Sequence, residues 1–311
     1  MKANDWHDPE WVAAAHEWIM AHLDAPATGP IVEVRVRPWS VTHRVSTAAG
    51  TRWFKANTAA CAYEAPLAAA LAGWVPDAVL APLAVDDRGW LLSADAGPTL
   101  RDEIGAGPPV ETWARMLQAY AVLQRETAAR ADEMVALGVP DMRLPLLPGL
   151  LKGFLASVET EGDVAAVPFA DWCAELAADG LPAALQHDDL TDANVFPVGP
   201  RGFRFFDWGD ACVSHPFGTM LVALGFAAHL LKLEPGAAEL ARLRDAYLEP
   251  WTDLAPATTL RRSVSLAYRI DRVPRALAWQ RAVQDAALPV DEDFRTAAAY
   301  WVGELPAPAV I

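Results

Sequence analysis

The chain has 311 residues, of which 53% are hydrophobic, and a formal net charge of −15 at pH 7. This length suits one large domain or two lobes with a sizeable buried core. The acidic balance argues against nucleic-acid binding, because phosphate backbones select basic surfaces, and it is compatible either with a cationic small-molecule partner or with an acidic surface that only aids solubility.

The distribution of apolar residues and cysteines indicates a cytoplasmic protein. The longest apolar stretches are interrupted by Trp, Pro and charged residues, so no membrane span is expected. The N-terminal segment 1–9 is polar and lacks the apolar centre of a signal peptide. The three cysteines, Cys61, Cys173 and Cys212, are scattered, which suits reduced thiols better than a disulfide framework or a zinc site.

The first part of the chain predicts a β-rich lobe. Asp8 before Pro9 is typical of a helix start, and this helix should run to about residue 23. Alternation of apolar and charged residues then predicts a half-buried strand at 31–36, and further strands are expected at 41–47 and 51–56. The third strand ends on Lys55, and a helical stretch at 60–71 with one acid, Glu64, follows it. The order strand, lysine, helix, glutamate matches the ion pair that fixes a phosphate-binding lysine, although both could also be solvated surface charges.

The rest of the chain predicts a larger, mainly helical lobe. Two further strands, at 79–85 and 89–94, complete the first lobe, so we expect lobes at 1–95 and 96–311. Thr99 and Asp102 have the spacing of a capping box at the start of the second lobe. Helices are then expected at about 109–135, 145–159, 168–178, 216–232, 236–249, 256–283 and 291–302, with strands between 185 and 209.

The most informative stretch lies at 187–209. His187, Asp189 and Asn194 have the spacing of a kinase catalytic loop, with the asparagine five positions after the aspartate. Asp207-Trp208-Gly209 follows where such enzymes place a metal-binding aspartate. The pattern predicts that Asp189 takes the proton of an acceptor hydroxyl and that Asn194 and Asp207 bind Mg²⁺. An ordinary polar turn between two buried strands would use the same residue types, but the complete set in this order favours function.

On these residues the chain resembles the aminoglycoside phosphotransferase-like family of small-molecule kinases, whose fold is related to that of protein kinases. The resemblance spans the chain from about Val32 to the last helices. It implies an α+β, two-lobed fold and ATP or GTP with Mg²⁺ as cofactors. By position, it also implies that Lys55 binds phosphates, that Glu64 pairs with Lys55, and that His187 is structural.

The resemblance also places the nucleotide and reveals three departures. Segment 91–100 looks like the hinge between lobes, so the nucleotide base is expected at 93–96, which includes Ser93 and Asp95. The turn at 38–42 has no glycine, so phosphate contact would have to come from Ser40, Thr42 and backbone N–H groups. Asp188 replaces a common glycine and adds charge beside Asp189, and Thr219 stands where the family often has an aspartate.

The acceptor site is expected in the C-terminal helices. Asp271 and Trp279 could grip a polar or cationic ring, although Arg269, Asp271, Arg272 and Arg275 also have the spacing of surface ion pairs on a helix. The sequence therefore favours an ATP-dependent phosphotransferase that acts on a hydroxyl of a small molecule such as an aminoglycoside, an amino sugar or a related metabolite. The alternative is a pseudokinase-like regulator that binds nucleotide or ligand without turnover, which the glycine-free turn and Thr219 would suit.

Overall fold

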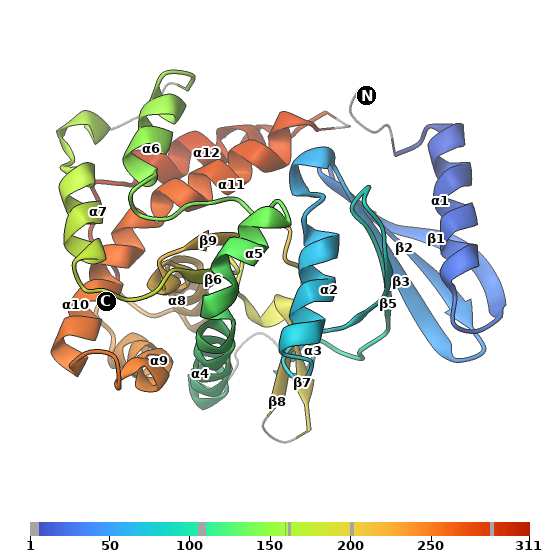
Figure 1. Ribbon diagram of the computed structural model, residues 1–311, viewed down its shortest axis with the longest axis horizontal. Helices are drawn as coiled ribbons and strands as arrows, with labels where there is room; N and C mark the ends of the chain where they lie inside the picture. Colours follow the sequence, from blue (N-terminus) through green and yellow to red (C-terminus); the bar gives the residue numbers. More distant parts are fainter. Residues whose placement is uncertain (1–5, 105–109, 159, 161–162, 200–201, 287–288) are drawn as a thin grey trace.

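The computed structural model describes residues 6–104, 110–158, 160, 163–199, 202–286 and 289–311. Strands and two helices form a β-rich lobe from the first third of the chain, and helices dominate the remainder, which lies beside that lobe (Figure 1). The mixed α+β architecture expected from the sequence is present.

The first lobe is built on a five-stranded antiparallel sheet with the order β1-β2-β3-β5-β4. Its strands are β1 (Ala27–Val36), β2 (Ser40–Thr47), β3 (Gly50–Asn57), β4 (Pro82–Val85) and β5 (Trp90–Ala94). The fourth strand is shorter than the expected 79–85, because Val79 pairs instead with Phe205 of the second lobe. In the sheet, β3 lies between β2 and β5, so the backbone at Lys55 is paired with a neighbouring strand on both sides.

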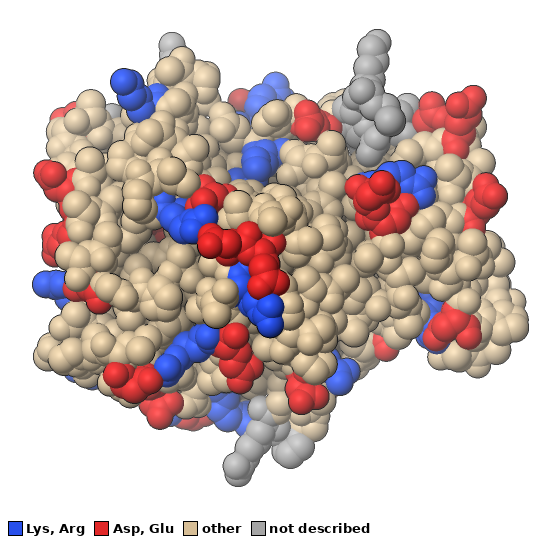
Figure 2. Space-filling model, in the orientation of Figure 1, with Lys and Arg blue, Asp and Glu red and all other residues tan. Residues whose placement is uncertain are grey.

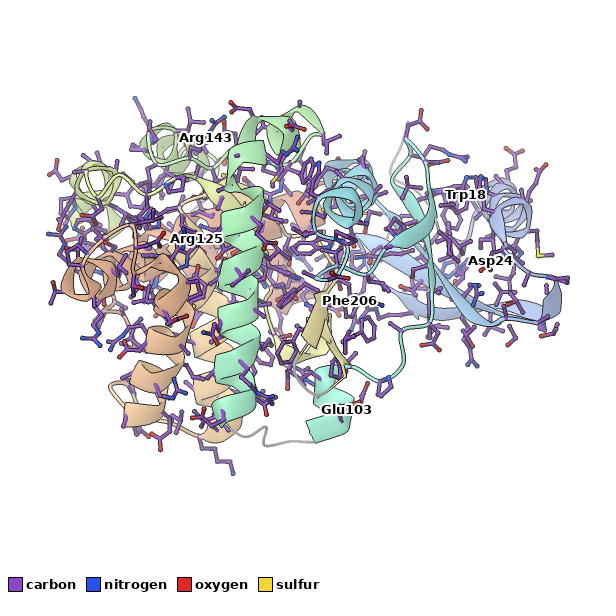
Figure 3. The ribbon with its side chains drawn as sticks, turned by 60° about the horizontal axis from the view of Figure 1, so that its bottom comes forward. Trp18, Asp24, Glu103, Arg125, Arg143 and Phe206 are labelled. Atoms are coloured by element: carbon purple, nitrogen blue, oxygen red, sulfur yellow. The ribbon has the colours of Figure 1, made fainter. Side chains whose placement is uncertain are left out.

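Helix α1 (Pro9–His22) covers the outer face of this sheet, and α2 (Glu64–Trp74) lies on the side of the second lobe (Figure 1). The Asp8 carboxylate accepts hydrogen bonds from the N–H groups of Glu10 and Trp11, so the predicted cap is confirmed. Trp18, which Figure 3 shows between α1 and the sheet, packs with Phe54 and Trp90 in a core separate from that of the second lobe.

The second lobe contains most of the helices. It begins with α3 (Leu100–Ile104), where the carboxylate of Asp102 accepts hydrogen bonds from the backbone and hydroxyl of Thr99, as the capping pattern predicted. The others are α4 (Val110–Thr127), α5 (Ala131–Ala136), α6 (Leu147–Leu155), α7 (Phe169–Ala177), α8 (Met220–Leu231), α9 (Ala238–Leu248), α10 (Ala257–Ile270), α11 (Arg272–Gln284) and α12 (Glu292–Gly303). Part of the expected helices at 109–135 and 145–159 falls on residues 109 and 159, outside the described residues.

Two of the expected helices are divided. The helix expected at 256–283 breaks at Asp271, because Pro274 has no N–H to bond the carbonyl of Ile270 and is tolerated only in a first turn. The helix expected at 109–135 changes to a 3-10 turn at Ala128–Arg130, where the Thr127 hydroxyl bonds the Leu123 carbonyl. The first of these breaks places the start of α11 against the polar loop.

Two short ladders carry the polar loop to the junction of the lobes. β6 (Ala184–Gln186) pairs with β9 (Cys212–Ser214), and β7 (Val195–Val198) pairs with β8 (Gly202–Phe205). Backbone hydrogen bonds from Leu80 to Phe205 and from Phe205 to Ala78 join β8 to the first lobe. None of the helices in the described parts of the chain is long and apolar enough to span a bilayer.

The face seen in Figure 2 carries acidic and basic side chains next to one another. Arg143, for example, forms ion pairs with both Asp132 and Asp141. Such exposed pairs contribute little to stability, about 0–1 kcal/mol each, so the fold depends mainly on its buried apolar cores.

Candidate active site

The loop between β6 and β7 holds Asp189 and Asn194 in contact. The Asn194 side-chain amide donates to both the carbonyl and the carboxylate of Asp189, each at 2.9 Å. His187 is fully buried, and its Nε2 donates to the Phe206 carbonyl at 2.8 Å. Burial lowers the pKa of His187, which favours the neutral ring. His187 therefore ties the loop to the segment before Asp207, the backbone contact expected of a structural histidine.

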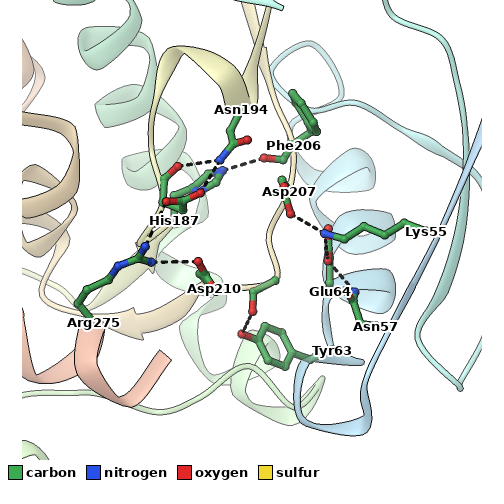
Figure 4. Close-up of polar contacts among 12 residues, drawn as sticks. Lys55, Asn57, Tyr63, Glu64, His187, Asn194, Phe206, Asp207, Asp210 and Arg275 are labelled. Atoms are coloured by element: carbon green, nitrogen blue, oxygen red, sulfur yellow. Dashed lines mark hydrogen bonds and ion pairs between the residues drawn. The ribbon is translucent and has the colours of Figure 1, made fainter. Parts of the chain in front are cut away.

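Lys55 joins Glu64 and Asp207 (Figure 4). Its ammonium group lies 2.6 Å from a Glu64 carboxylate oxygen and 2.5 Å from an Asp207 oxygen. Burial opposes the charge on Lys55, but the two carboxylates outweigh it and raise the pKa of the amine. The same ammonium group holds the pKa of Asp207 below its usual range against the effect of burial. Asn57 donates to Glu64 at 2.7 Å, so Glu64 is held from two sides.

The turn after β8 is shaped around Asp207. Asp207 has a left-handed backbone with φ of 66°, a conformation that aspartate tolerates better than most residues. The Phe206 N–H donates to the Asn194 carbonyl, which brings the two expected metal ligands onto neighbouring segments. From the first lobe, the Tyr63 hydroxyl donates to the carbonyl of Gly209 at 2.5 Å and lies 3.1 Å from that of Ala211.

Arg275 is a site residue that sequence reasoning missed. The expected surface pairing of Asp271, Arg272 and Arg275 is wrong, because all three residues are buried. From the first turn of α11, the Arg275 guanidinium donates to the Asp188 carbonyl, to Asp210 at 2.9 Å and to Asp189 at 3.3 Å (Figure 4). Burial raises the pKa of Asp189 to about 6, and the charge of Arg275 opposes that rise. Arg275 therefore fixes Asp189 from the side opposite Asn194.

Asp188 and Asp271 form a buried carboxyl pair behind the loop. Asp188 has φ of 57°, which explains why a glycine would suit this position and why aspartate is tolerated. Both side chains are at most 2% exposed. Burial raises the pKa of Asp271 to about 7 and that of Asp188 well above its ordinary value. The charge of Asp271 adds to the rise at Asp188, whereas hydrogen bonds with Gln186 and Asp188 oppose the rise at Asp271. At least one of the two is therefore protonated near neutral pH.

Gln124 and Asp271 brace the loop in the region of Thr219. The fully buried Gln124 amide donates to the carbonyls of Leu185 and Pro216 and to the Thr219 hydroxyl. Gly218 packs against Gln186 and Asp271 so closely that an added Cβ would overlap both side chains. The loop is thus supported from α4 and from the start of α11.

Two cavities meet at this cluster. The hinge cavity, about 390 Å³, lies between the sheet and the second lobe and is lined by Ser93, Asp95, Phe206 and other residues of both lobes. Figure 3 shows Phe206 between the lobes, and its ring stacks on that of Phe196 at 4.4 Å. The Asp189 cavity, about 170 Å³, contains Asp189, Asp210, Arg275 and Trp279. Three residues line both cavities and so mark their boundary: Arg35, Lys55 and Asp207.

The expected site residues divide into those at the cavities and those behind them. The residues that the structure brings to the cavities are Lys55, Glu64, Ser93, Asp95, Asp189, Asp207 and Trp279, with Asn194 bound to Asp189. Ser40 is buried at the start of β2 and Asp271 lies behind the loop that holds Asp189, and neither lines these cavities. Arg35, Arg37 and Trp39 line the cavities and were not anticipated; their position on and after an alternating strand gave no signal that they face a site.

The donors present suit Mg²⁺. Asn194 uses its amide nitrogen toward Asp189, which leaves its oxygen available, and Asp207 uses one carboxylate oxygen toward Lys55. Hard oxygen donors of this kind, few in number and completed by phosphates and water, are the ligands that Mg²⁺ prefers. The described residues contain no cluster of three or more His, Cys, Asp or Glu side chains that could form an all-protein metal site.

No protein-family model matches the chain, and no curated protein matches it in sequence. Solved structures do match. An ethanolamine kinase from Plasmodium vivax aligns with a TM-score of 0.61 at 13% identity, over 90% of this chain and 82% of that one. A choline/ethanolamine kinase family protein from Mesorhizobium loti aligns with a TM-score of 0.57 at 20% identity, over 95% and 94%. The chain has the fold of these small-molecule kinases.

A third solved structure extends the likeness to the family on which the sequence resemblance rested. A thermostable mutant aminoglycoside phosphotransferase, in ternary complex with ADP and hygromycin B, aligns with a TM-score of 0.52 at 14% identity, over 94% of this chain and 97% of that one. The expected two-lobed, protein-kinase-like fold is confirmed.

Proposed function

We propose that this protein is a Mg²⁺-dependent kinase that transfers the γ-phosphate of ATP to a hydroxyl group of a small molecule. The observation that supports this most directly is the boundary between the two cavities. Lys55, held by Glu64 and Asp207, lies on that boundary, and Asp189 lies just beyond it in a cavity of its own. A phosphoryl group that crosses from one cavity to the other must pass these residues.

In this proposal the nucleotide occupies the hinge cavity. Its base would lie at residues 93–96, beside Ser93 and Asp95. Its phosphates would reach Lys55, and Arg35 and Thr42, which line the same cavity, would supply the contacts that a glycine-rich turn supplies elsewhere. The phosphate contact expected of Ser40 has no support here, since its side chain is buried outside the cavity and its N–H donates to the Arg37 carbonyl. When bound to Asn194 and Asp207, Mg²⁺ would neutralise charge on the phosphate oxygens.

The acceptor hydroxyl would approach Asp189 from the Asp189 cavity. As its oxygen bonds to the γ-phosphorus, the bond from phosphorus to the bridging oxygen of ADP breaks and the hydroxyl proton passes to Asp189. Asn194 and Arg275 hold the Asp189 carboxylate in place during this step. The loop offers a base and no matched nucleophile, so we expect direct in-line transfer without a phosphorylated enzyme.

The solved structures in the same fold bear on the acceptor class. Their names record ethanolamine and choline kinases and an aminoglycoside phosphotransferase with hygromycin B, so a small-molecule acceptor is the corresponding proposal here. We also propose that the lobes divide near residue 95. A cytoplasmic location is consistent with three cysteines that are all buried and free.

A pseudokinase-like regulator is the alternative, because the turn at 38–42 lacks glycine and Thr219 replaces an acid. A pseudokinase that binds another ligand would not respond to Mg-ATP, whereas one that binds nucleotide would respond to Mg-ATP without releasing ADP. Mg-ATP binding therefore tests the kinase against the first form, and ADP release tests it against the second. We expect millimolar Mg-ATP to raise the thermal unfolding midpoint of the wild-type protein, and Lys55→Ala to weaken Mg-ATP binding by at least about tenfold, which corresponds to ~1.4 kcal/mol.

The matched control is Lys152→Ala, since Lys152 lies on α6 away from both cavities. Isothermal titration with Mg-ATP would measure both variants, and Lys152→Ala should bind like the wild type. Absence of any stabilisation of the wild-type protein by Mg-ATP would contradict the proposed kinase.

A further inference from the structure

The Asp189 cavity is small. Its volume of about 170 Å³ is below the ~300–1,000 Å³ typical of ligand sites and equals the space of about five or six water molecules. Aminoglycosides and other multi-ring compounds exceed this space. If the proposed function is correct, this space favours an acceptor of a few carbon atoms over a multi-ring compound.

An aromatic cluster from both lobes fixes one wall of this cavity. Trp39, in the turn between β1 and β2, meets Trp279 of α11 edge-to-face at 5.8 Å and Phe294 of α12 at 5.1 Å. Trp279 and Phe294 stack on each other at 5.6 Å. The turn between β1 and β2 therefore packs against the second lobe. This contact fixes the position of the backbone from which the side chains of the turn reach the cavity.

The same turn holds the backbone of Arg37. The Arg37 carbonyl accepts a hydrogen bond from the indole of the buried Trp6 at 3.0 Å, and the backbones of Arg37 and Ser40 bond each other. The Arg37 side chain lines the Asp189 cavity and does not line the hinge cavity. Arg37 is exposed, and its anchored backbone keeps this cationic side chain at the acceptor side of the boundary.

The charges in the cavity leave Arg37 without a partner. Three carboxylates line the cavity, and each already pairs with a basic side chain. Asp207 pairs with Lys55, and both Asp189 and Asp210 pair with Arg275. By contrast, the side chains of Arg35 and Arg37 form no hydrogen bond or ion pair with residues that the structure describes. Arg35 also lines the hinge cavity and is matched by the nucleotide phosphates, so Arg37 is the cation left for the acceptor.

We infer that the acceptor is a small hydroxylated anion whose carboxylate or phosphate group is bound by Arg37. This inference rests on the proposed kinase activity and narrows its substrate class. It differs from the cationic acceptor that the net charge of −15 made plausible, because the local charges around Asp189 decide what enters the cavity. A cation would compete with Lys55 and Arg275, which the carboxylates there already share, whereas an anion finds a guanidinium suited to bidentate binding.

The test uses four compounds of similar size that differ in charge: glycerate, glycerol 3-phosphate, glycerol and 3-amino-1,2-propanediol. They head a library of small hydroxyl compounds screened for Mg-ATP-dependent ADP release by the full-length protein. We expect the best acceptors to be anionic, and the carboxylate and phosphate members of the set distinguish the two sources of charge. A best acceptor that is cationic, neutral or an aminoglycoside would overturn the inference.

Variants separate acceptor binding from nucleotide binding. We expect Arg37→Ala to raise the KM for the best acceptor by about 10- to 100-fold, in line with the loss of a charged hydrogen bond, and to change the KM for ATP by less than about threefold. Arg37→Lys should restore part of the loss. The control is Arg44→Ala on β2, since Arg44 is exposed and lines neither cavity. An unchanged acceptor KM in Arg37→Ala would contradict the assignment.

A second measurement keeps the inference distinct from the proposed function. If no compound releases ADP, thermal shift with the four compounds in the presence of Mg-ADP tests binding alone. Stabilisation of the wild-type protein by glycerate or glycerol 3-phosphate that is lost in Arg37→Ala would support the anion site even though turnover failed. No stabilisation, or equal stabilisation by the amine, would overturn it. Failure of Mg-ATP itself to bind would instead contradict the proposed kinase.

Discussion

At the scale of single residues, the buried acids behind the catalytic loop are the least expected feature. Two carboxyls that are at most 2% exposed cannot both be ionised cheaply, because charge is costly in an apolar surrounding. Asp188 nevertheless suits its left-handed backbone, and Asp271 fills the space beside Gly218. The pair therefore acts as a positioning element that depends on retaining a proton.

This dependence gives a pH prediction for Asp271. Its pKa is about 7 in the folded protein and about 3.9 when unfolded, so the folded state binds the extra proton between these values. The stability that the protonated carboxyl confers is fully present below about pH 4 and is lost as pH rises through 7. We expect the wild-type unfolding midpoint to fall relative to that of Asp271→Asn between pH 5 and pH 8, as measured by calorimetry.

The control for this prediction is Asp253→Asn. Asp253 is a surface carboxylate whose pKa is lowered by Arg125. It is therefore ionised throughout pH 5 to 8, and the difference in unfolding midpoint between the wild type and Asp253→Asn should stay constant over this interval. Equal pH dependence of the wild type and Asp271→Asn would contradict a raised pKa at Asp271.

At the scale of elements, close packing of the short turn before α8 supports the catalytic loop. Gly218 has no room for a Cβ, because the buried side chains of Gln186 and Asp271 occupy that space. We expect Gly218→Ala to destabilise the protein by about 1–3 kcal/mol, the usual cost of overpacking, and to lower the unfolding midpoint in denaturant.

Gly225→Ala, within α8, is the matched control. An added Cβ there meets only the Tyr268 hydroxyl at 3.9 Å, and alanine is the better helix former by about 1 kcal/mol. Gly225→Ala should therefore be neutral or stabilising. A Gly218→Ala protein as stable as Gly225→Ala would show that the turn can yield without cost.

The sequence predicts the elements that depend on interactions between residues close together in the chain, and it misses those that depend on distant partners. The Asp8 cap, the Thr99–Asp102 box and the strands expected at 31–36, 41–47 and 51–56 depend on local signals, and the structure contains them. The half-buried face expected at 31–36 is not present, because most of that segment is exposed. The break at Asp271 has a local signal, Pro274, which the expectation of one helix at 256–283 overlooked. β4 begins later than expected because Val79 pairs with Phe205, a partner far along the chain that no local pattern reveals.

At the scale of the whole molecule, the candidate site joins residues of both lobes and residues far apart within the second lobe. Lys55 and Asp207 are 152 positions apart, and Arg275 and Asp189 are 86 apart. The spacing within 187–194 identified the loop, and strand order identified Lys55. No local pattern could show that α11 would deliver Arg275 to the same point or that Arg35 and Arg37 would face the cavities.

The join between the lobes yields a further prediction. Tyr63 links the first lobe to the turn after Asp207 through the carbonyls of Gly209 and Ala211. We expect Tyr63→Phe to cost about 1–3 kcal/mol, because it leaves these carbonyls without that partner, and to weaken Mg-ATP binding. Calorimetry and titration would measure both effects. Tyr300→Phe, at a residue 60% exposed, should change stability by less than about 0.5 kcal/mol.

The account depends most on Asp189 as the base that accepts the hydroxyl proton. The direct measurement is ADP release and product phosphorylation by the wild type and by Asp189→Asn, with Mg-ATP and the best acceptor from the screen. We predict that Asp189→Asn binds Mg-ATP with an affinity close to that of the wild type and transfers phosphate at least about 100-fold more slowly. Near wild-type transfer by Asp189→Asn would contradict the assignment.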